Sequence, residues 1–456
     1  MTLSVGEAHS MYQRVASQAA RFFCPLSTVV QRTHYRYRAV VKGTKEANRK
    51  VAVTEPSRVA SQPELADALG LIHMLAEEVG PRRPCSDAEK DAANRLAAWL
   101  RDRGVDSQIE EFRGYASFTA PYTALFTTSL AGGLLQRSHR RGARRAGDAL
   151  ALSSLVTAAL EADLRLTPLS DRLARRPSVN VRGHVPSSGP TRRRVCLCGH
   201  LDTTRSGLMF HPRVARHLAV LLQVPAVSAL ALAAGPLLRR APGGRAIRGA
   251  GLAGVAFALT MLLERELRGQ DVRGASDNAS GTAVALQLAA ECAATPLAHT
   301  EVDVLITGCE ESGLLGAQAY ARRHTLRAKE ATFLNFDTVG GDVPLTYILR
   351  EGTGAITRTA PRPGLIAMLE EIAERRPELG LEPAETTPGL PTDATVMRAR
   401  GWDAVTLLAQ GETIPNYHWP TDTYENIAPQ TVESALETGR ELLRALDAQV
   451  KRRPAR

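Results

Sequence analysis

Four short apolar segments recur along this chain of 456 residues and constrain its fold more than any other feature. Each holds four to six residues, a length typical of buried strands. Helical patterns such as the apolar stretch 281–292 lie between them. Strands that alternate with helices predict an α/β fold in which helices flank a mostly parallel central sheet. The four expected strands are 195–198, 302–307, 332–336 and 404–408.

Two regions, 119–163 and 208–268, interrupt this alternation. Each contains two apolar stretches joined by an arginine-bearing loop, which predicts a helical hairpin inserted into the fold. The stretch 218–238 has roughly the length that spans a bilayer, although Gln223 and Pro225 weaken it, and the other three stretches are shorter. Two interpretations therefore stay open. The hairpins are embedded in a membrane, or they are core helices or a lid.

The chain has a formal net charge of +10, and residues 1–60 are polar and basic without sustained periodicity, which predicts an N-terminal extension. The arginine clusters at 137–145 and 172–176 are not interleaved with aromatic residues, so we expect solvated or headgroup-facing charge and no nucleic-acid partner. The first thirty residues lack the features of a cleaved secretory signal. We expect a membrane-associated or cytoplasmic protein.

The segment Ser86-Asp87-Ala88-Glu89 has the pattern of a capping box. In that motif the first and last side chains each accept a hydrogen bond from the other residue's backbone N–H. Apolar residues then recur at helical spacing until Gly104. The main body of the fold is therefore expected to begin near this helix.

Candidate metal ligands stand at the ends of the expected strands. His200 follows 195–198 directly, and Asp202 is placed to orient its imidazole. A lone His-x-Asp pattern is weak, because a histidine near a strand end is more often a satisfied polar residue. Asp277 lies in the glycine-bounded turn 274–281, where it reaches two cations or caps the following helix, and capping is favoured for it taken singly.

Three further acids and a second histidine follow in the same way. Glu310 and Glu311 lie between a buried strand and a glycine-marked turn, and adjacent buried carboxylates repel unless a cation or a shared proton relieves them. Asp337 follows the strand 332–336, and His418 stands near the final helix. Two histidines with three carboxylates are ligands that suit zinc, and one acid remains for proton transfer.

In their order, these motifs resemble the co-catalytic zinc aminopeptidases, whose relatives include bacterial aminopeptidase S, glutamate carboxypeptidase and the transferrin receptor. The resemblance covers residues 62–118, 177–207 and 270–445. It implies a zinc-exopeptidase-like, phosphorylase/hydrolase-like three-layer sandwich with two zinc ions as cofactors. It further implies that one ion is held by His200, Asp277 and Asp337 and the other by Asp277, Glu311 and His418, with Asp277 bridging.

The resemblance also implies an activity, the release of N-terminal residues from a peptide substrate. Glu310 is then the general base. Tyr417 is expected to hydrogen-bond the developing oxyanion, and a packing role for its ring is equally expected. Two alternatives stay open on the same scaffold: a single-zinc acyl transferase like glutaminyl cyclase, and a membrane-tethered binding protein without activity.

The domain organisation follows from the same comparison. The catalytic domain is expected over residues 61–450, interrupted by the two insertions. The interval between Asp202 and Asp277 is much longer than in compact family members and holds the second insertion. The interval between Asp337 and His418 is too short for the separate dimerisation domain of neighbouring two-metal peptidases, so a single catalytic domain is expected.

Overall fold

The computed structural model describes residues 62–352, 358–387 and 391–451. These residues belong to one unit of the chain, which begins at Val59. The expected extension at 1–60 lies outside the described residues.

A single eight-stranded sheet organises the fold, in the order β1-β2-β4-β3-β5-β8-β6-β7. The four central strands β4, β3, β5 and β8 are parallel, whereas β1, β2 and β6 pair antiparallel to their inner neighbours. All four expected strands form this parallel centre, so the predicted α/β class is confirmed. The strands are β1 (Asp106–Gly114), β2 (Arg176–Val185), β3 (Arg193–His200), β4 (Thr300–Thr307), β5 (Ala331–Phe336), β6 (Leu345–Ile348), β7 (Leu381–Ala384) and β8 (Asp403–Ala409).

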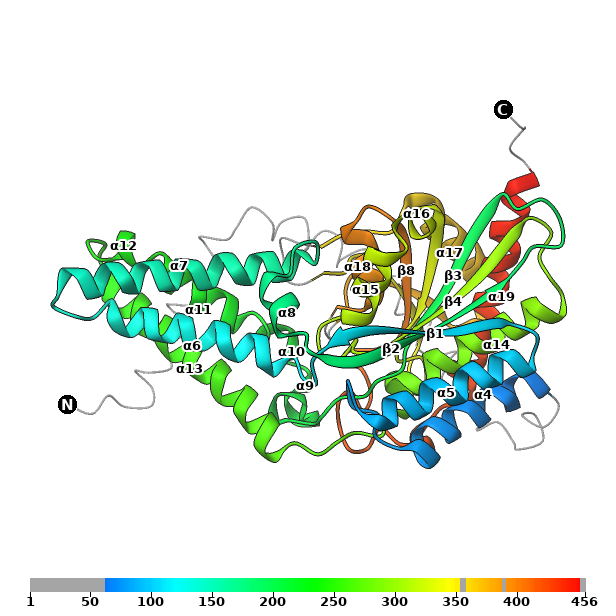
Figure 1. Ribbon diagram of the computed structural model, residues 1–456, viewed down its shortest axis with the longest axis horizontal. Helices are drawn as coiled ribbons and strands as arrows, with labels where there is room; N and C mark the ends of the chain where they lie inside the picture. The colour runs from blue at the N-terminus through cyan, green and yellow to red at the C-terminus, as the bar shows by residue number, and fades with distance from the viewer. Residues whose placement is uncertain (1–61, 353–357, 388–390, 452–456) are drawn as a thin grey trace. The chain divides into compact units, whose positions relative to one another are not determined.

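Helices cover both faces of the sheet, as Figure 1 shows. Along β3, Val195 and Leu197 join the larger apolar cluster, while Cys196 and Cys198 point into the other. This alternation follows from the two-residue period of a strand. The first face carries α4 (Pro63–His73), α5 (Asp87–Asp102), α14 (Gly281–Ala294), α17 (Pro363–Arg375) and α19 (Pro429–Lys451), and the second carries α15 (Leu315–Arg323), α16 (Thr325–Glu330) and α18 (Asp393–Ala399).

The two insertions form one group of helices, which lie side by side in Figure 1. The first insertion is the predicted hairpin of α6 (Thr119–Leu135) and α7 (Arg141–Asp163), followed by α8 (Pro168–Leu173). The second contains α9 (Pro212–Ala215), α10 (Leu218–Leu221), α11 (Val224–Ala233), α12 (Gly235–Leu238) and α13 (Gly244–Arg268). We call α6, α7, α11 and α13 the insertion bundle.

The second insertion differs from its prediction in two ways. The stretch 218–238 is not one helix but three, because Pro225 and Pro236 each occupy the first turn of a new helix, the helical position that tolerates proline. The other stretch is longer than the expected 249–263. Helix α13 has 25 residues and is the one described helix that is long and apolar enough to cross a membrane.

The second insertion leaves and re-enters the fold at one point. Arg205 and Asp271 form an isolated antiparallel bridge between the two ends. The Arg205 guanidinium also donates to the carbonyl oxygen of Glu266 at 2.9 Å, and the buried Arg265 donates to the Thr204 hydroxyl at 2.5 Å. The two ends of the insertion are therefore joined to each other where it meets the rest of the fold.

Only one of the two hydrogen bonds predicted for the capping box is present. The Ser86 side chain accepts from the backbone N–H of Glu89 at 3.1 Å. The Glu89 carboxylate, however, accepts from the backbone N–H groups of Cys85 and Cys309 and from the Ser178 hydroxyl. Glu89 is fully buried, and burial raises its pKa to about 9. Its carboxylate thus supports the loop after β4 and not the N-terminus of its own helix.

Within the insertion bundle, α6 and α7 touch through glycine. A Cβ atom at Gly147 would lie 2.6 Å from the carbonyl oxygen of Gly132, and one at Gly132 would lie 2.8 Å from the backbone nitrogen of Ala151. The Ser154 hydroxyl donates across the same contact to the carbonyl oxygen of Leu125 at 2.8 Å. The two backbones therefore have no space for a larger side chain here.

We expect Gly147→Ala to lower the free energy of unfolding by about 1–3 kcal/mol, because the added methyl group overpacks this contact. The matched control is Gly249→Ala on α13, where a Cβ atom would meet nothing within 4 Å. There the substitution should raise stability by about 0.5–1 kcal/mol through helix propensity. Urea unfolding of both variants checks the difference, and equal effects would contradict the close contact.

Candidate metal centre

The parallel strands bring the candidate ligands to one edge of the sheet. His200 is the last residue of β3, Asp337 is the first residue after β5, and the acidic pair follows β4 after Gly308 and Cys309. Because these strands are parallel neighbours, their carboxyl ends meet at that edge. Asp277 joins them from the turn Ala275–Ser280 before α14, and His418 from the loop before α19.

All five expected ligands lie together in two groups that share Asp277. One group is His200, Asp277 and Asp337 and the other is Asp277, Glu311 and His418, with one donor atom of each residue within 4.8 Å of the others in its group. The two oxygens of Asp277 face different imidazoles, Oδ1 at 3.1 Å from His200 Nε2 and Oδ2 at 3.2 Å from His418 Nε2. This is the placement of a carboxylate between two cations.

The chemistry of these atoms fits divalent cations. The Nδ1–H of His200 donates to the carbonyl oxygen of Asp202 at 3.1 Å, which leaves the Nε2 lone pair facing an oxygen of Asp277. Within the described part of the chain, Asp277 Oδ2 and Glu311 Oε1 are buried without a hydrogen-bond partner. Buried polar atoms of this kind are costly unless a partner satisfies them. Nitrogen and oxygen ligands in this mixture suit zinc.

The pKa values of the ligands are shifted by burial and by the charges of the other ligands. Burial, together with the nearby charge of Asp277, raises the pKa of Asp337 to about 7. Burial alone would raise the pKa of Asp277, but the nearby imidazoles of His200 and His418 bring it below its usual range. Burial lowers the pKa of His418, yet Glu311 and Asp277 outweigh it and raise the value to about 9. The pKa of each of these ligands thus depends on its buried neighbours.

Glu310 belongs to neither ligand group. Its Oε2 lies 3.9 Å from His200 Nε2, and its side chain lines the cavity above the site. Burial, reinforced by the charges of Asp393 and Asp337 against the opposing effect of His200, raises the pKa of Glu310 well above its usual value. This is the environment of a carboxylate that exchanges a proton.

Asp202 acts differently from the expectation. Its backbone carbonyl oxygen, and not its carboxylate, orients the imidazole of His200, since the carboxylate lies 3.7 Å from Nδ1. The carboxylate instead accepts from the backbone N–H groups of Glu310 at 2.9 Å and Glu311 at 3.0 Å. Asp202 therefore positions the acidic pair.

Asp422 does the same for the turn that carries Asp277. Its carboxylate accepts from the backbone N–H groups of Ser276 at 2.7 Å and Asp277 at 3.0 Å. Helix capping, the alternative role for Asp277, belongs to Asn278, whose Oδ1 accepts from the N–H of Gly281 at 2.9 Å. Asp422 was not predicted as a site residue, although its place four residues after His418 was a signal.

Arg82 is a second residue that the sequence analysis missed. Its fully buried guanidinium connects the segment after His200 to the segment before Asp277. No motif in the sequence marks it. Its nitrogens donate to the carbonyl oxygens of Leu75, Gly80, Leu201, Arg273 and Gly274.

Two other side chains line or support the site. The ring of Tyr417 stacks on His418 with centroids 3.9 Å apart and meets Phe210 edge-on at 5.8 Å, which is the packing role expected beside its oxyanion role. Asp393 is buried and accepts from the Thr307 hydroxyl at the end of β4. Burial raises the pKa of Asp393 to about 7.

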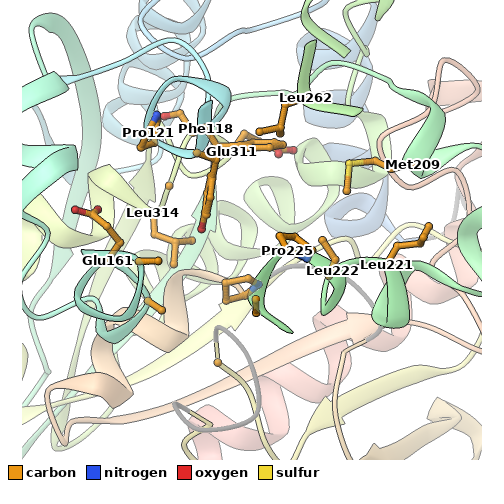
Figure 2. Close-up of a pocket in the computed structure, with 18 of the residues that line it drawn as sticks. Phe118, Pro121, Glu161, Met209, Leu221, Leu222, Pro225, Leu262, Glu311 and Leu314 are labelled. Atoms are coloured by element: carbon orange, nitrogen blue, oxygen red, sulfur yellow. The ribbon is translucent and has the colours of Figure 1, made fainter. Parts of the chain in front are cut away.

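A cavity of about 900 Å³ opens above the ligands. Glu310, Glu311 and the two histidines lie at its polar end. Residues of the insertion bundle and its connections, among them Phe118, Pro121, Pro225 and Leu262, line the rest of the cavity, and Figure 2 shows Phe118 and Pro121 on the side of Glu311 and Pro225 across from them.

Three solved structures share this fold. A zinc aminopeptidase from Bacillus subtilis is 15% identical, with 84% of this chain and 95% of that chain covered and a TM-score of 0.50. An aminopeptidase from Aneurinibacillus sp. strain AM-1 is 16% identical (85% and 95% covered, TM-score 0.50). A leucine aminopeptidase precursor from Bacteroides thetaiotaomicron VPI-5482 is 13% identical (83% and 95% covered, TM-score 0.50). No curated protein matches the chain.

The family comparison covers most of the site. Residues 254–443 match the model of Peptidase family M28. This segment contains Asp277, Glu311, Asp337 and His418, four of the five candidate ligands, together with Glu310. Over this segment the chain is similar to peptidase family M28, and the similarity supports a metallopeptidase.

Proposed function

We propose that the chain is a two-zinc exopeptidase that releases N-terminal residues from peptides. The observation that carries this proposal is the bridging position of Asp277 between two complete ligand groups. The similar solved structures support the finer activity, since all three are named as aminopeptidases. The glutaminyl cyclase-like alternative needs one zinc ion only, so one of the two ligand groups would have no purpose in it.

The residues of the site have separate roles in binding metal, transferring a proton and positioning the base. His200, Asp277 and Asp337 would hold one ion, and Asp277, Glu311 and His418 the other. Bound zinc supplies a Lewis acid that polarises the scissile carbonyl and acidifies water. Glu310 accepts the proton of the attacking water and returns it to the leaving amine, so water is added across the peptide bond. Asp202 holds Glu310 in place through the backbone N–H.

We expect Glu310→Gln to lower kcat by about 10²–10⁴-fold, because the amide keeps the shape of the side chain but cannot accept the proton. The kcat is measured by hydrolysis of leucyl dipeptides by the zinc-loaded protein, with metal content checked on the same sample. The control is Glu385→Gln, at a glutamate whose side chain is 68% exposed. Unchanged turnover in Glu310→Gln would remove this residue from the mechanism.

The same assay separates the finer activity from its alternatives. A free N-terminus should be required, so acetylated dipeptides should not be cleaved. Cleavage of blocked peptides would exclude an aminopeptidase, and cyclisation of N-terminal glutamine in place of hydrolysis would favour the acyl transferase.

Metal content tests the ligand assignment. Two zinc ions per chain are expected by elemental analysis, and His418→Ala should lose one of them, because each imidazole belongs to one ligand group. His73→Ala serves as the control, since that side chain is 50% exposed. One zinc ion in the unaltered protein would favour the single-zinc alternative, and no zinc would favour the binding protein.

We also propose that the insertion bundle lies in a lipid bilayer. Within the described part of the chain, fifteen large apolar side chains are exposed, and all but Leu166 belong to the two insertions. Helix α13 measures about 37 Å at 1.5 Å per residue, which exceeds the roughly 30 Å of a bilayer's hydrocarbon core. The others are Leu134, Leu135, Leu152, Val156, Leu160, Leu208, Val220, Val227, Leu230, Leu237, Ile247, Phe257, Leu263 and Leu267.

The charge at one end of the bundle favours anionic lipid. Arginines are exposed in both loops at that end, in the loop between α6 and α7 and in the one after α12. The two loops lie together, since Arg239 Nη2 contacts Asp148 of α7 at 2.5 Å. Such clusters are attracted to phosphate headgroups. The exposed residues are Arg137, Arg140, Arg141, Arg239 and Arg240.

The protein should float with vesicles that contain phosphatidylglycerol, and Val227→Asp with Leu230→Asp should reduce the bound fraction. Aspartate at the centre of a bilayer costs about 2.5–3.5 kcal/mol. Gln449→Glu on α19 adds negative charge at an exposed position outside the insertions and should leave flotation unchanged. A protein that forms dimers through the bundle and does not float would refute the bilayer proposal.

A further inference from the structure

The cavity above the metal ligands is much longer than one amino-acid residue requires. Along α7 its lining runs from Ala162 to Ser154, and along α6 from Pro121 to Phe126. At 1.5 Å per residue the α7 lining alone is about 12 Å long, the length of about four extended residues. All four helices of the insertion bundle contribute to the wall.

The inner wall of this cavity is apolar. Phe126 and Leu125 of α6, Leu155 of α7, and Met261 and Leu262 of α13 face it. Figure 2 shows Leu262 and Pro225 on opposite sides of the cavity, with Glu311 on the side of Leu262. A polar substrate would lose its water here without gaining partners, whereas an apolar chain gains free energy for each buried methylene group.

Two polar side chains that α7 contributes to the wall, Ser154 and Glu161, have partners within the protein. The Ser154 hydroxyl donates to the Leu125 carbonyl oxygen at 2.8 Å. The Glu161 carboxylate accepts from the Ser170 hydroxyl at 2.6 Å and from the backbone N–H of Leu169 at 2.7 Å. These groups shape the wall and leave its apolar surface to select the ligand.

The substrate's long part must lie on one side of the scissile bond. If the enzyme is an aminopeptidase, the acyl side is a single residue with a free amine. The leaving amine is then the part that can extend several residues into the cavity.

We propose that the site cleaves the N-terminal residue from substrates whose leaving amine carries an extended apolar chain. This assignment rests on the proposed aminopeptidase function and adds its substrate class. The chain is either a hydrocarbon or an apolar peptide segment, since both present the same surface to these side chains. The insertions, and not the metal ligands, then determine the specificity.

The test uses the zinc-loaded full chain and leucine amides of methylamine, butylamine, hexylamine and octylamine. We expect kcat/KM to rise along the series by up to about fourfold per methylene group, mainly through KM, because the tail binds equally in the ground and transition states. Leucyl peptides with tails of three alanines or three leucines form the second arm. A gain confined to the alkyl series identifies a hydrocarbon tail, and a gain in both identifies an apolar peptide.

Two neighbouring residues of α13 provide a matched pair of variants. Leu262 lines the cavity, whereas Leu263 is 44% exposed and is not part of its wall. Leu262→Ser should flatten the dependence on chain length, and Leu263→Ser should keep it. Ala258→Phe fills the cavity from the same helix and should abolish the gain for octylamine while methylamide hydrolysis is retained.

The outcomes separate this proposal from the one on which it rests. A flat profile with normal methylamide hydrolysis overturns the apolar-tail assignment and leaves the aminopeptidase standing. Hydrolysis of none of the amides overturns both. Equal flattening by Leu262→Ser and Leu263→Ser, with folding shown by unchanged methylamide turnover, also overturns the role of the cavity wall.

Discussion

Four buried carboxylates lie around two imidazoles at the carboxyl edge of the sheet, and the rest of the structure serves to hold them there. Like charges repel strongly away from water. The surrounding protein must therefore hold these carboxylates in place, and bound cations would offset their negative charge. The parallel strands β3, β4 and β5 provide the fixed frame, because their carboxyl ends meet at one edge of the sheet.

The same supporting device appears twice around this frame. Asp202 and Asp422 each accept two successive backbone N–H groups, the first under Glu310 and Glu311 and the second under Ser276 and Asp277. Burial and the charge of Asp277 raise the pKa of Asp422 to about 7, which shows how closely its charge is tied to the site. A hydrogen bond to an ionised acceptor is stronger than a neutral one, so these acids stiffen the two ligand-bearing turns.

The sequence predicted the parts of the protein that depend on local pattern. The four central strands, the helix after Asp277 and the hairpin of α6 and α7 follow from period and length, and the candidate ligands follow from residue type at strand ends. It did not predict what depends on distant partners. Arg82 has no motif because its acceptors are backbone carbonyls from several segments. The Glu89 carboxylate does not complete the capping box because it accepts instead from the backbone N–H of Cys309, 220 residues away. The prediction of one helix at 218–238 was wrong, because Pro225 and Pro236 each begin a new helix.

The bridge between Arg205 and Asp271 explains how His200 and Asp277, 77 positions apart, meet at 3.1 Å. With its two ends joined, the intervening segment behaves as a closed appendage, whose length adds little entropic cost to the chain that carries it. A change in the length or sequence of this appendage can therefore leave the metal ligands beneath it in place. The metal ligands and much of the wall of the cavity above them thus lie on separable parts of the chain.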